Sequence, residues 1–126
     1  MGAETAYLEG HSGPVTALYP LPDGRLASVS ADHTIRLWDP KTGAEKVRLE
    51  GHSGPVTALC PLPDGRLASA SADRTIRLWD LATGAETARL EAEGAITCLA
   101  ALPGLHLAAG DSLGRLHWLE VRTRND

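Results

Sequence analysis

The sequence predicts an all-β fold made of repeated four-stranded antiparallel sheets. Residues 49–89 repeat residues 8–48 with seven differences: Tyr19/Cys60, Val29/Ala70, His33/Arg74, Pro40/Leu81, Lys41/Ala82, Lys46/Thr87 and Val47/Ala88. Within each copy, short segments of alternating apolar and polar residues are separated by Gly, Pro and Asp, which is the pattern of strands and turns. A period of about 41 residues indicates a chain of stacked structural units, each of which needs its neighbours to bury its apolar faces.

The first half of the first copy predicts a hairpin. Residues 10–14, Gly-His-Ser-Gly-Pro, form a loop rich in strand-breaking residues, and residues 15–19 alternate as a strand does. Residues 20–24 end in Pro-Asp-Gly, in which proline fixes φ and Asp-Gly supplies the positive φ of a tight turn. Residues 25–30 then return as the second strand.

The second half of the copy predicts two further strands. After a turn at residues 31–33, residues 34–39 form the third strand and residues 44–49 the fourth. Together the four strands form an antiparallel meander. Residues 50–90 repeat this plan with few changes.

A third copy keeps the plan and loses its signature residues. Its alignment needs one deletion in the first loop, after which three replacements appear: Ala92-Glu93 for Gly51-His52, Ala109 for Ser69 and Leu119-Glu120 for Trp79-Asp80. This copy supplies three strands. Residues 2–8, GAETAYL, instead match the fourth strand of the other copies, so the chain opens with one spare strand.

A period near 41 residues with Gly-His at its front and Trp-Asp at its back resembles the WD40 repeat, the blade of a β-propeller. The resemblance implies that residues 1–126 form a single unit of three propeller blades. The unit divides into a spare outer strand at residues 2–8, blade 1 at 9–49, blade 2 at 50–90 and an incomplete blade 3 at 91–121.

Three blades leave an apolar face bare at each end, and propellers usually have four to eight blades. We therefore expect the ring to be completed by homo-oligomerisation through head-to-tail contacts. A homodimer with six blades is favoured, and a homotrimer with nine is the alternative. Rings in this family commonly close by pairing a strand from one chain end with the blade at the other. The strand that would complete blade 3 of an adjacent chain consists of Glu4, Thr5, Ala6, Tyr7 and Leu8.

Two sets of polar residues recur at equal spacing: His11, Ser28, Asp32 and Trp38, then His52, Ser69, Asp73 and Trp79. Ser, His and Asp suggest a hydrolase, but the sets occur without a Gly-x-Ser-x-Gly motif or an asymmetric loop. In WD40 proteins the matching residues form a buried hydrogen-bonded network, so we favour a structural role and a non-enzymatic protein. The family pattern points to Ser28 as the hydroxyl, with Ser30 as the alternative. The third copy lacks the His, Ser and Trp together, and its Trp118 is expected to pack into the core as Leu78 does.

Binding remains the most plausible task. WD40 rings usually contact protein or peptide partners through the loops before the first strand and between the second and third. The candidate positions there are Ser12, His33, Ser53 and Arg74; the alternative is that they are ordinary solvated loop residues.

Composition argues against several other classes. Twelve Lys+Arg against 16 Asp+Glu, with the basic residues scattered, disfavours nucleic acid as a partner. The absence of an 18-residue apolar run and of a signal peptide predicts no membrane contact and a cytoplasmic protein. Neither paired metal-ligand spacing nor a phosphate-binding glycine loop occurs, so no metal and no cofactor are expected. Cys60 and Cys98 are interpreted as packing residues.

Residues 109–120 add a second resemblance, to the terminal blade of WD40 regions at the C-terminus of large bacterial signalling ATPases. The alternative function is therefore a C-terminal sensor or regulatory propeller fragment of a larger bacterial signalling protein. A neighbouring ATPase or kinase domain in the full gene would favour that alternative.

Overall fold

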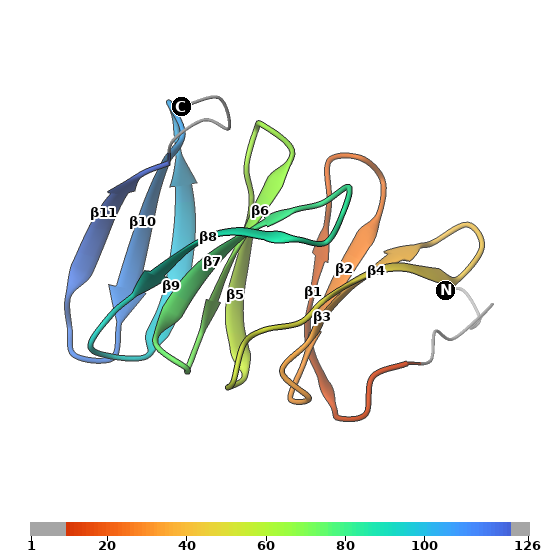
Figure 1. The fold of residues 1–126 in the computed structure, drawn as a ribbon, viewed down its shortest axis with the longest axis horizontal. Coiled ribbons are helices and arrows are strands. Elements are labelled where there is room, and N and C mark those ends of the chain that lie inside the picture. Colours follow the sequence, from red (N-terminus) through yellow and green to blue (C-terminus); the bar gives the residue numbers. More distant parts are fainter. Residues whose placement is uncertain (1–9, 122–126) are drawn as a thin grey trace, which may run out of the picture.

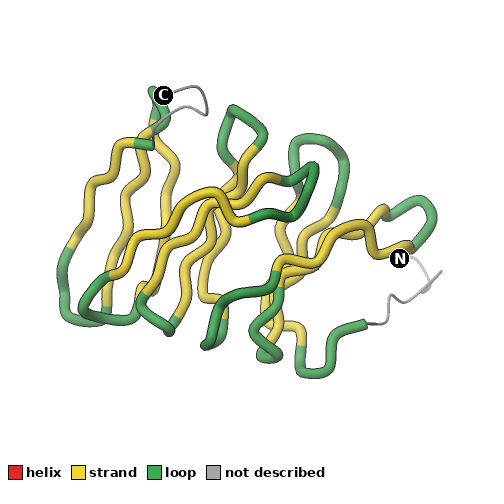
Figure 2. Tube along the Cα trace, in the orientation of Figure 1, coloured by secondary structure: helices red, strands yellow, loops and turns green. Residues whose placement is uncertain are grey.

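A computed structural model describes residues 10–121 and confirms the predicted all-β architecture. Two four-stranded antiparallel sheets and one three-stranded sheet stand in a row (Figure 1), joined by turns (Figure 2). Sheet 1 contains β1 Val15–Pro20, β2 Leu26–Ser30, β3 Ile35–Asp39 and β4 Ala44–Leu49. Sheet 2 contains β5 Val56–Pro61, β6 Arg66–Ser71, β7 Thr75–Asp80 and β8 Glu86–Glu91. Sheet 3 contains β9 Ile96–Leu102, β10 His106–Asp111 and β11 Leu116–Glu120.

The predicted hairpin turns have the expected backbone. Gly24 and Gly65 have φ values of 92° and 88°, a region that glycine enters without steric cost. In the first turn, the Leu21 N–H donates to the Arg25 carbonyl at 2.9 Å. The turn therefore fixes the register of β1 on β2 locally, in which Leu18 lies opposite Ser28.

The core lies between the sheets. One buried cluster fills the space between sheets 1 and 2, and two smaller clusters join sheet 2 to sheet 3. The first cluster consists of Leu21, Ala27, Val29, Ile35, Leu37 and Leu49 on the sheet 1 side and Val56, Leu59, Leu67, Trp79 and Leu81 on the sheet 2 side. Sheet 2 is thus covered on both faces, whereas sheets 1 and 3 each have one neighbouring sheet within residues 10–121.

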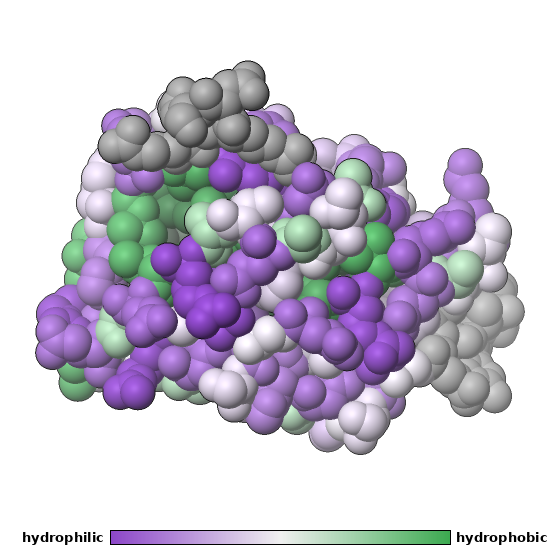
Figure 3. Space-filling view, in the orientation of Figure 1, coloured by the Kyte–Doolittle hydropathy of each residue, from purple (hydrophilic) through white to green (hydrophobic). Residues whose placement is uncertain are grey.

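The sheets at the two ends of the row carry exposed apolar side chains. Val15 and Leu18 are exposed on sheet 1, and Leu116 and Trp118 are exposed on sheet 3. The expectation that Trp118 packs into the core is therefore wrong. Leu78, at the matching position of sheet 2, packs against a cluster shared with sheet 3, but no further sheet among the described residues covers Trp118. Figure 3 shows an apolar area over the strands of sheet 3.

The predicted closing strand, residues 4–8, lies outside the described residues, so the proposed exchange of this strand stays a prediction. Within residues 10–121, β11 pairs on one side only, with β10. The same part of the chain contains no helix with the length and apolarity needed to cross a membrane.

Candidate functional site

The first recurrent polar set comes together in sheet 1. His11 precedes β1, Ser28 lies on β2, Asp32 lies in the turn after β2 and Trp38 on β3. The Trp38 indole N–H donates to Ser28 Oγ at 2.8 Å, and Ser28 Oγ lies 2.6 Å from His11 Nε2. His11 Nδ1 lies 3.0 Å from Asp32 Oδ2. Because the carboxylate only accepts, Nδ1 carries the hydrogen and the Ser28 hydroxyl donates to Nε2.

The second set repeats this geometry in sheet 2. Trp79 Nε1 donates to Ser69 Oγ at 2.7 Å, Ser69 Oγ lies 2.7 Å from His52 Nε2, and His52 Nδ1 lies 2.9 Å from Asp73 Oδ2. Each set joins the loop before the first strand of its sheet to the second and third strands. One connected group of side chains thus holds together the loop before the first strand, the second strand, the turn that follows it and the third strand.

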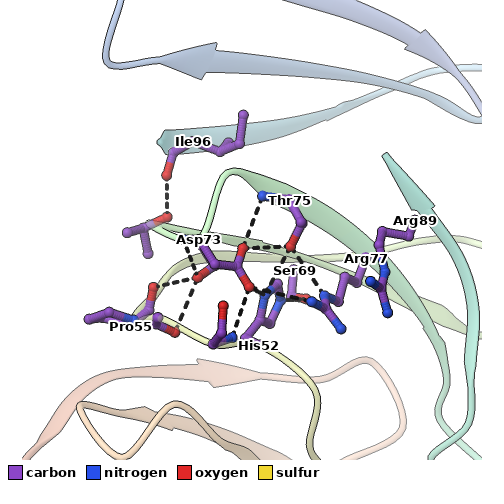
Figure 4. A network of polar contacts seen from close by, with 12 residues as sticks. His52, Pro55, Ser69, Asp73, Thr75, Arg77, Arg89 and Ile96 are labelled. Atoms are coloured by element: carbon purple, nitrogen blue, oxygen red, sulfur yellow. Dashed lines mark hydrogen bonds and ion pairs between the residues drawn. The ribbon is translucent and has the colours of Figure 1, made fainter. Parts of the chain in front are cut away.

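The network is larger than the sequence indicated. Thr75 donates to Asp73 Oδ1 through its hydroxyl at 2.6 Å and its backbone N–H at 2.9 Å. Arg77 donates from Nε to Thr75 Oγ1 at 3.1 Å (Figure 4) and from Nη1 to Glu86 Oε1 at 2.9 Å. Thr34, Arg36 and Glu45 make the same contacts in sheet 1. These residues were missed, although their identity in both copies was a usable signal.

Burial and hydrogen bonding shift the pKa values of Asp73 and His52 in the second network. Burial opposes the charge on Asp73, but hydrogen bonds from Thr75, His52 and the Ser53 backbone outweigh it and hold the pKa of that carboxyl well below its usual range. The pKa of His52 is lowered because burial disfavours its charged form more than the bond to Asp73 favours it. No buried side-chain nitrogen or oxygen among residues 10–121 lacks a hydrogen-bond partner, so the network is fully bonded in its neutral-histidine form.

The alternative serines, Ser30 and its counterpart Ser71, bond to backbone groups and not to the histidines. Ser30 Oγ accepts from the Asp32 backbone N–H at 3.1 Å. The equivalent Ser71 hydroxyl lies 2.9 Å from the Pro55 carbonyl, to which it donates. These serines hold the turns beside the network, and the histidines contact Ser28 and Ser69.

The arrangement has the order of a hydrolase triad, hydroxyl to imidazole to carboxylate. Its serines are inaccessible, however: Ser28 is 3% exposed and Ser69 is 0% exposed. Each hydroxyl oxygen also receives a tryptophan N–H. A nucleophile must reach the reacting carbon of a substrate, so this geometry suits a structural network.

The four loop candidates lie in the loops before β1 and β5 and in the turns between β2 and β3 and between β6 and β7. These loops are at the lower edge of the row of sheets in Figure 1. The backbone N–H groups of Ser12 and Ser53 donate to Asp32 and Asp73, each at 3.0 Å. His33 and Arg74 both have φ of 73°, a left-handed conformation that is unusual for residues other than glycine. The polar networks therefore fix the loop backbone that presents these side chains.

Sheet 3 uses a different polar arrangement around Asp111, at the position of Ser71 in sheet 2. The Asp111 carboxylate accepts from the backbone N–H groups of Leu113 and Arg115 and from His117 Nε2, each at 2.9 Å. The backbone N–H of Arg115 and the bond from His117 are the main reasons that the pKa of Asp111 lies well below its usual range. This carboxylate organises the turn between β10 and β11, and sequence reasoning did not identify it.

Metal-binding geometry is absent from the described part of the chain: it contains no group of three or more His, Cys, Asp or Glu side chains that could hold a metal ion. Cys60 is buried and Cys98 is exposed, and both thiols are free.

Solved structures with similar folds are WD40 and related proteins. The WD40 β-propeller domain of Doa1 has a TM-score of 0.82 and 27% identity, covering 91% of this chain and 39% of that chain. A chain of the mitotic checkpoint complex has a TM-score of 0.84 and 26% identity, covering 94% and 39%. The computationally designed Ika8 protein has a TM-score of 0.79 and 30% identity, covering 90% and 35%. The present chain thus spans about two fifths or less of the length of each.

The search of curated proteins found no match. The family model described as "WD domain, G-beta repeat" matches residues 2–39 and 43–80, which together make up more than half of the chain. Neither match extends into sheet 3, where the signature residues are replaced. The two matches, the three antiparallel sheets and the propeller neighbours lead to one conclusion: the chain belongs to the WD40 repeat family of β-propeller proteins.

Proposed function

We propose that the chain is a non-enzymatic propeller scaffold that assembles with copies of itself and presents its loop edge to protein or peptide partners. The scaffold role is carried by one observation: the residues that could perform chemistry are buried, bonded to one another and used to fix loops. A fully bonded network rigidifies the structure around it. Rigid loops lose little conformational freedom when they bind, which favours recognition.

The proposed binding surface consists of Ser12, His33, Ser53 and Arg74. Their loops are tied down through Asp32 and Asp73, and Arg74 is exposed. Holding a residue other than glycine at positive φ costs about 1 kcal/mol. The repetition of this conformation at His33 and Arg74 supports a role for these turns in presenting side chains.

Self-assembly follows from the exposed apolar residues at both ends of the row. Contiguous exposed apolar surface on a sheet face is unfavourable in water and commonly marks an interaction site. A head-to-tail contact would bury the faces at both ends and close a ring. Two chains would give six blades, within the usual range for propellers, and three would give nine. In either ring, residues 4–8 would add a fourth strand beside β11 of the next copy.

The assembly proposal is tested by the native mass of the 126-residue chain, measured by light scattering on a sizing column. We expect about twice the 13.3 kDa chain mass. Three times that mass would identify the nine-bladed ring. A stable monomer at all concentrations would contradict self-assembly.

The second candidate is a sensor or regulatory region of a larger signalling protein. Its support is that the chain spans about two fifths or less of the propeller chains it resembles, so further blades of the same polypeptide could cover the end faces. A stable monomer that becomes a closed propeller when expressed with its flanking sequence would establish this candidate.

A further inference from the structure

The contacts between neighbouring sheets inside the chain indicate how the end sheets of two copies would contact each other. We call the face that a sheet turns toward the next sheet its forward face, and the opposite one its back face. Between sheets 1 and 2, Leu37 on the forward face and Leu59 on the back face belong to one buried cluster. Between sheets 2 and 3, the residues at the equivalent positions, Leu78 on the forward face and Leu99 on the back face, pack against one buried cluster. The same strand positions are thus used at both internal contacts.

The forward face of sheet 3 has these positions and no partner among the described residues. Trp118 pairs with Ala108 as Leu78 pairs with Ala68, so Trp118 occupies the position of Leu78. Leu116 likewise occupies the position of Ile76. Leu116 is 73% exposed and Trp118 is 65% exposed.

The back face of sheet 1 is the other unpartnered surface. Val15 and Leu18 occupy the positions at which Val56 and Leu59 contribute to the first buried cluster. They are 53% and 58% exposed. An exposed forward face and an exposed back face of the same repeat type therefore lie at opposite ends of one chain.

We infer that the forward face of sheet 3 docks onto the back face of sheet 1 of a second copy, with Leu116 and Trp118 packed against Val15 and Leu18. This inference rests on the proposed self-assembly and specifies its interface. The register is that of the internal contacts, in which Leu37 and Leu59 share a cluster. Trp118 takes the place of Leu37, and its partner Leu18 that of Leu59.

Side-chain volumes on sheet 3 suit this register. The forward face has Gly110 where sheet 1 has Val29, because Gly110 pairs with Cys98 as Val29 pairs with Ala17. A Cβ atom at Gly110 would approach Cys98 Sγ to 2.8 Å. The side-chain volume lost at Gly110 offsets part of the volume gained at Trp118. The total side-chain volume on this face therefore stays close to that on the forward faces of sheets 1 and 2.

One polar contact differs between the two internal junctions. Thr57 donates from its hydroxyl to the Ile96 carbonyl at 2.6 Å, which joins sheet 2 to sheet 3. Thr97 and Val15 occupy the equivalent positions at the two ends of the chain. The Thr97 hydroxyl donates to the Gly110 carbonyl of its own sheet at 3.2 Å, as Thr16 donates to the Val29 carbonyl at 3.4 Å in sheet 1, so the apolar contacts alone define the register between copies.

A forward-to-back contact is heterologous, so each copy uses two different surfaces. This property can be tested with Leu18→Glu and Trp118→Lys. Either variant alone places a charge against an apolar face at every junction of its ring. We expect each to raise the dissociation constant of the ring at least about 100-fold. Mixed in equal amounts, the two variants form a ring of the parent size again, because one junction is unaltered and the other pairs the introduced carboxylate with the introduced ammonium.

The matched control is Leu113→Lys. Leu113 is 61% exposed and lies in the loop between β10 and β11, outside the sheet face. It should leave the ring mass unchanged. Circular dichroism checks that each variant folds, and Leu116→Lys replaces Trp118→Lys if that chain does not.

The outcomes separate this inference from the self-assembly proposal. A monomeric parent chain overturns both. A parent ring that survives Leu18→Glu or Trp118→Lys overturns the interface alone and leaves self-assembly standing. Failure of the mixture to restore the ring overturns the heterologous pairing, since two like faces in contact would gain nothing from mixing.

Discussion

Sheets 1 and 2 have almost the same sequence and very different surroundings. Val15 is 53% exposed and its counterpart Val56 is 5% exposed; Leu18 is 58% exposed and Leu59 is 5% exposed. The strands pair in the same order, and the bonds among His, Ser, Asp and Trp are the same in both. Burial at these positions is therefore set by whether a neighbouring sheet is present. Comparing equivalent substitutions in sheets 1 and 2 therefore measures how much a neighbouring sheet contributes to stability.

The largest effect is expected from Trp79→Ala, which should lower the free energy of unfolding by about 3–5 kcal/mol, the usual cost of removing a large buried aromatic. Trp79 belongs to the cluster between sheets 1 and 2 and bonds to Ser69. Trp38 makes the same bond in sheet 1 without belonging to that cluster, so Trp38→Ala should cost less. Urea unfolding of both variants gives the comparison, and an unchanged stability for Trp79→Ala would contradict the role assigned to the network.

The next effect compares Leu59 with Leu18. Leu59→Ala should destabilise the chain by about 2–5 kcal/mol because it leaves a cavity between two sheets. Leu18→Ala should cost less than about 1 kcal/mol in dilute monomer, where the side chain is exposed. At concentrations that favour the ring, its cost should rise toward that of Leu59→Ala. Thermal unfolding over a range of protein concentrations measures this, and equal costs in dilute monomer would contradict the exposure of Leu18 in the single chain.

Ser69→Ala separates the structural from the catalytic interpretation. Removing the hydroxyl leaves the Trp79 N–H and His52 Nε2 without a partner, at a cost of about 1–3 kcal/mol. We expect lower stability and, in parent and variant alike, no hydrolysis of activated esters above background. An esterase activity that disappears in a variant of unchanged stability would support the hydrolase.

The smallest effect is the dependence of stability on pH. The folded-state pKa of His52 lies below its ordinary value of 6.5, so the unfolded chain binds more protons as the pH falls through 6.5, and stability decreases there. The folded-state pKa of Asp73 lies below 3.8. Its contribution is complete above 3.8 and is lost as the pH falls further. Just below pH 6.5, the urea midpoint of the parent should fall more steeply with decreasing pH than the midpoint of His52→Gln. The same pH dependence in both proteins would contradict the contribution of His52.

Local sequence signals account for most of the strands and turns. The Pro-Asp-Gly turns act through φ preferences that need no tertiary contact, and Gly24 and Gly65 have the expected positive φ. The repeated His, Ser, Asp and Trp positions were found because they recur at fixed spacing. Arg77 and Glu86 were not, because each is an ordinary residue for an exposed strand and the two meet only when β7 pairs with β8. Thr75 was not, because its bonds to Asp73 depend on how the turn before β7 folds.

Sheet 3 shows where the sequence was insufficient. Asp111 was overlooked because its role depends on how the turn after β10 folds back to offer the Leu113 and Arg115 N–H groups. Trp118 was placed in the core by analogy with Leu78, but an analogous position is buried only if an analogous neighbour exists. Residue type predicts which face is apolar, and the number of sheets in the assembly decides whether that face is covered.

The most direct test of coverage is the reactivity of Cys98. This thiol is exposed on sheet 3, at the position where Ala58 is buried against sheet 3 in the internal contact. In a Cys60→Ala chain, it is the remaining thiol to react with a maleimide in excess. We predict rapid labelling at high dilution and at least about tenfold slower labelling once the chain assembles, as expected for a group buried in an interface. A labelling rate that stays constant while the native mass doubles would contradict the claim that a second copy covers this face.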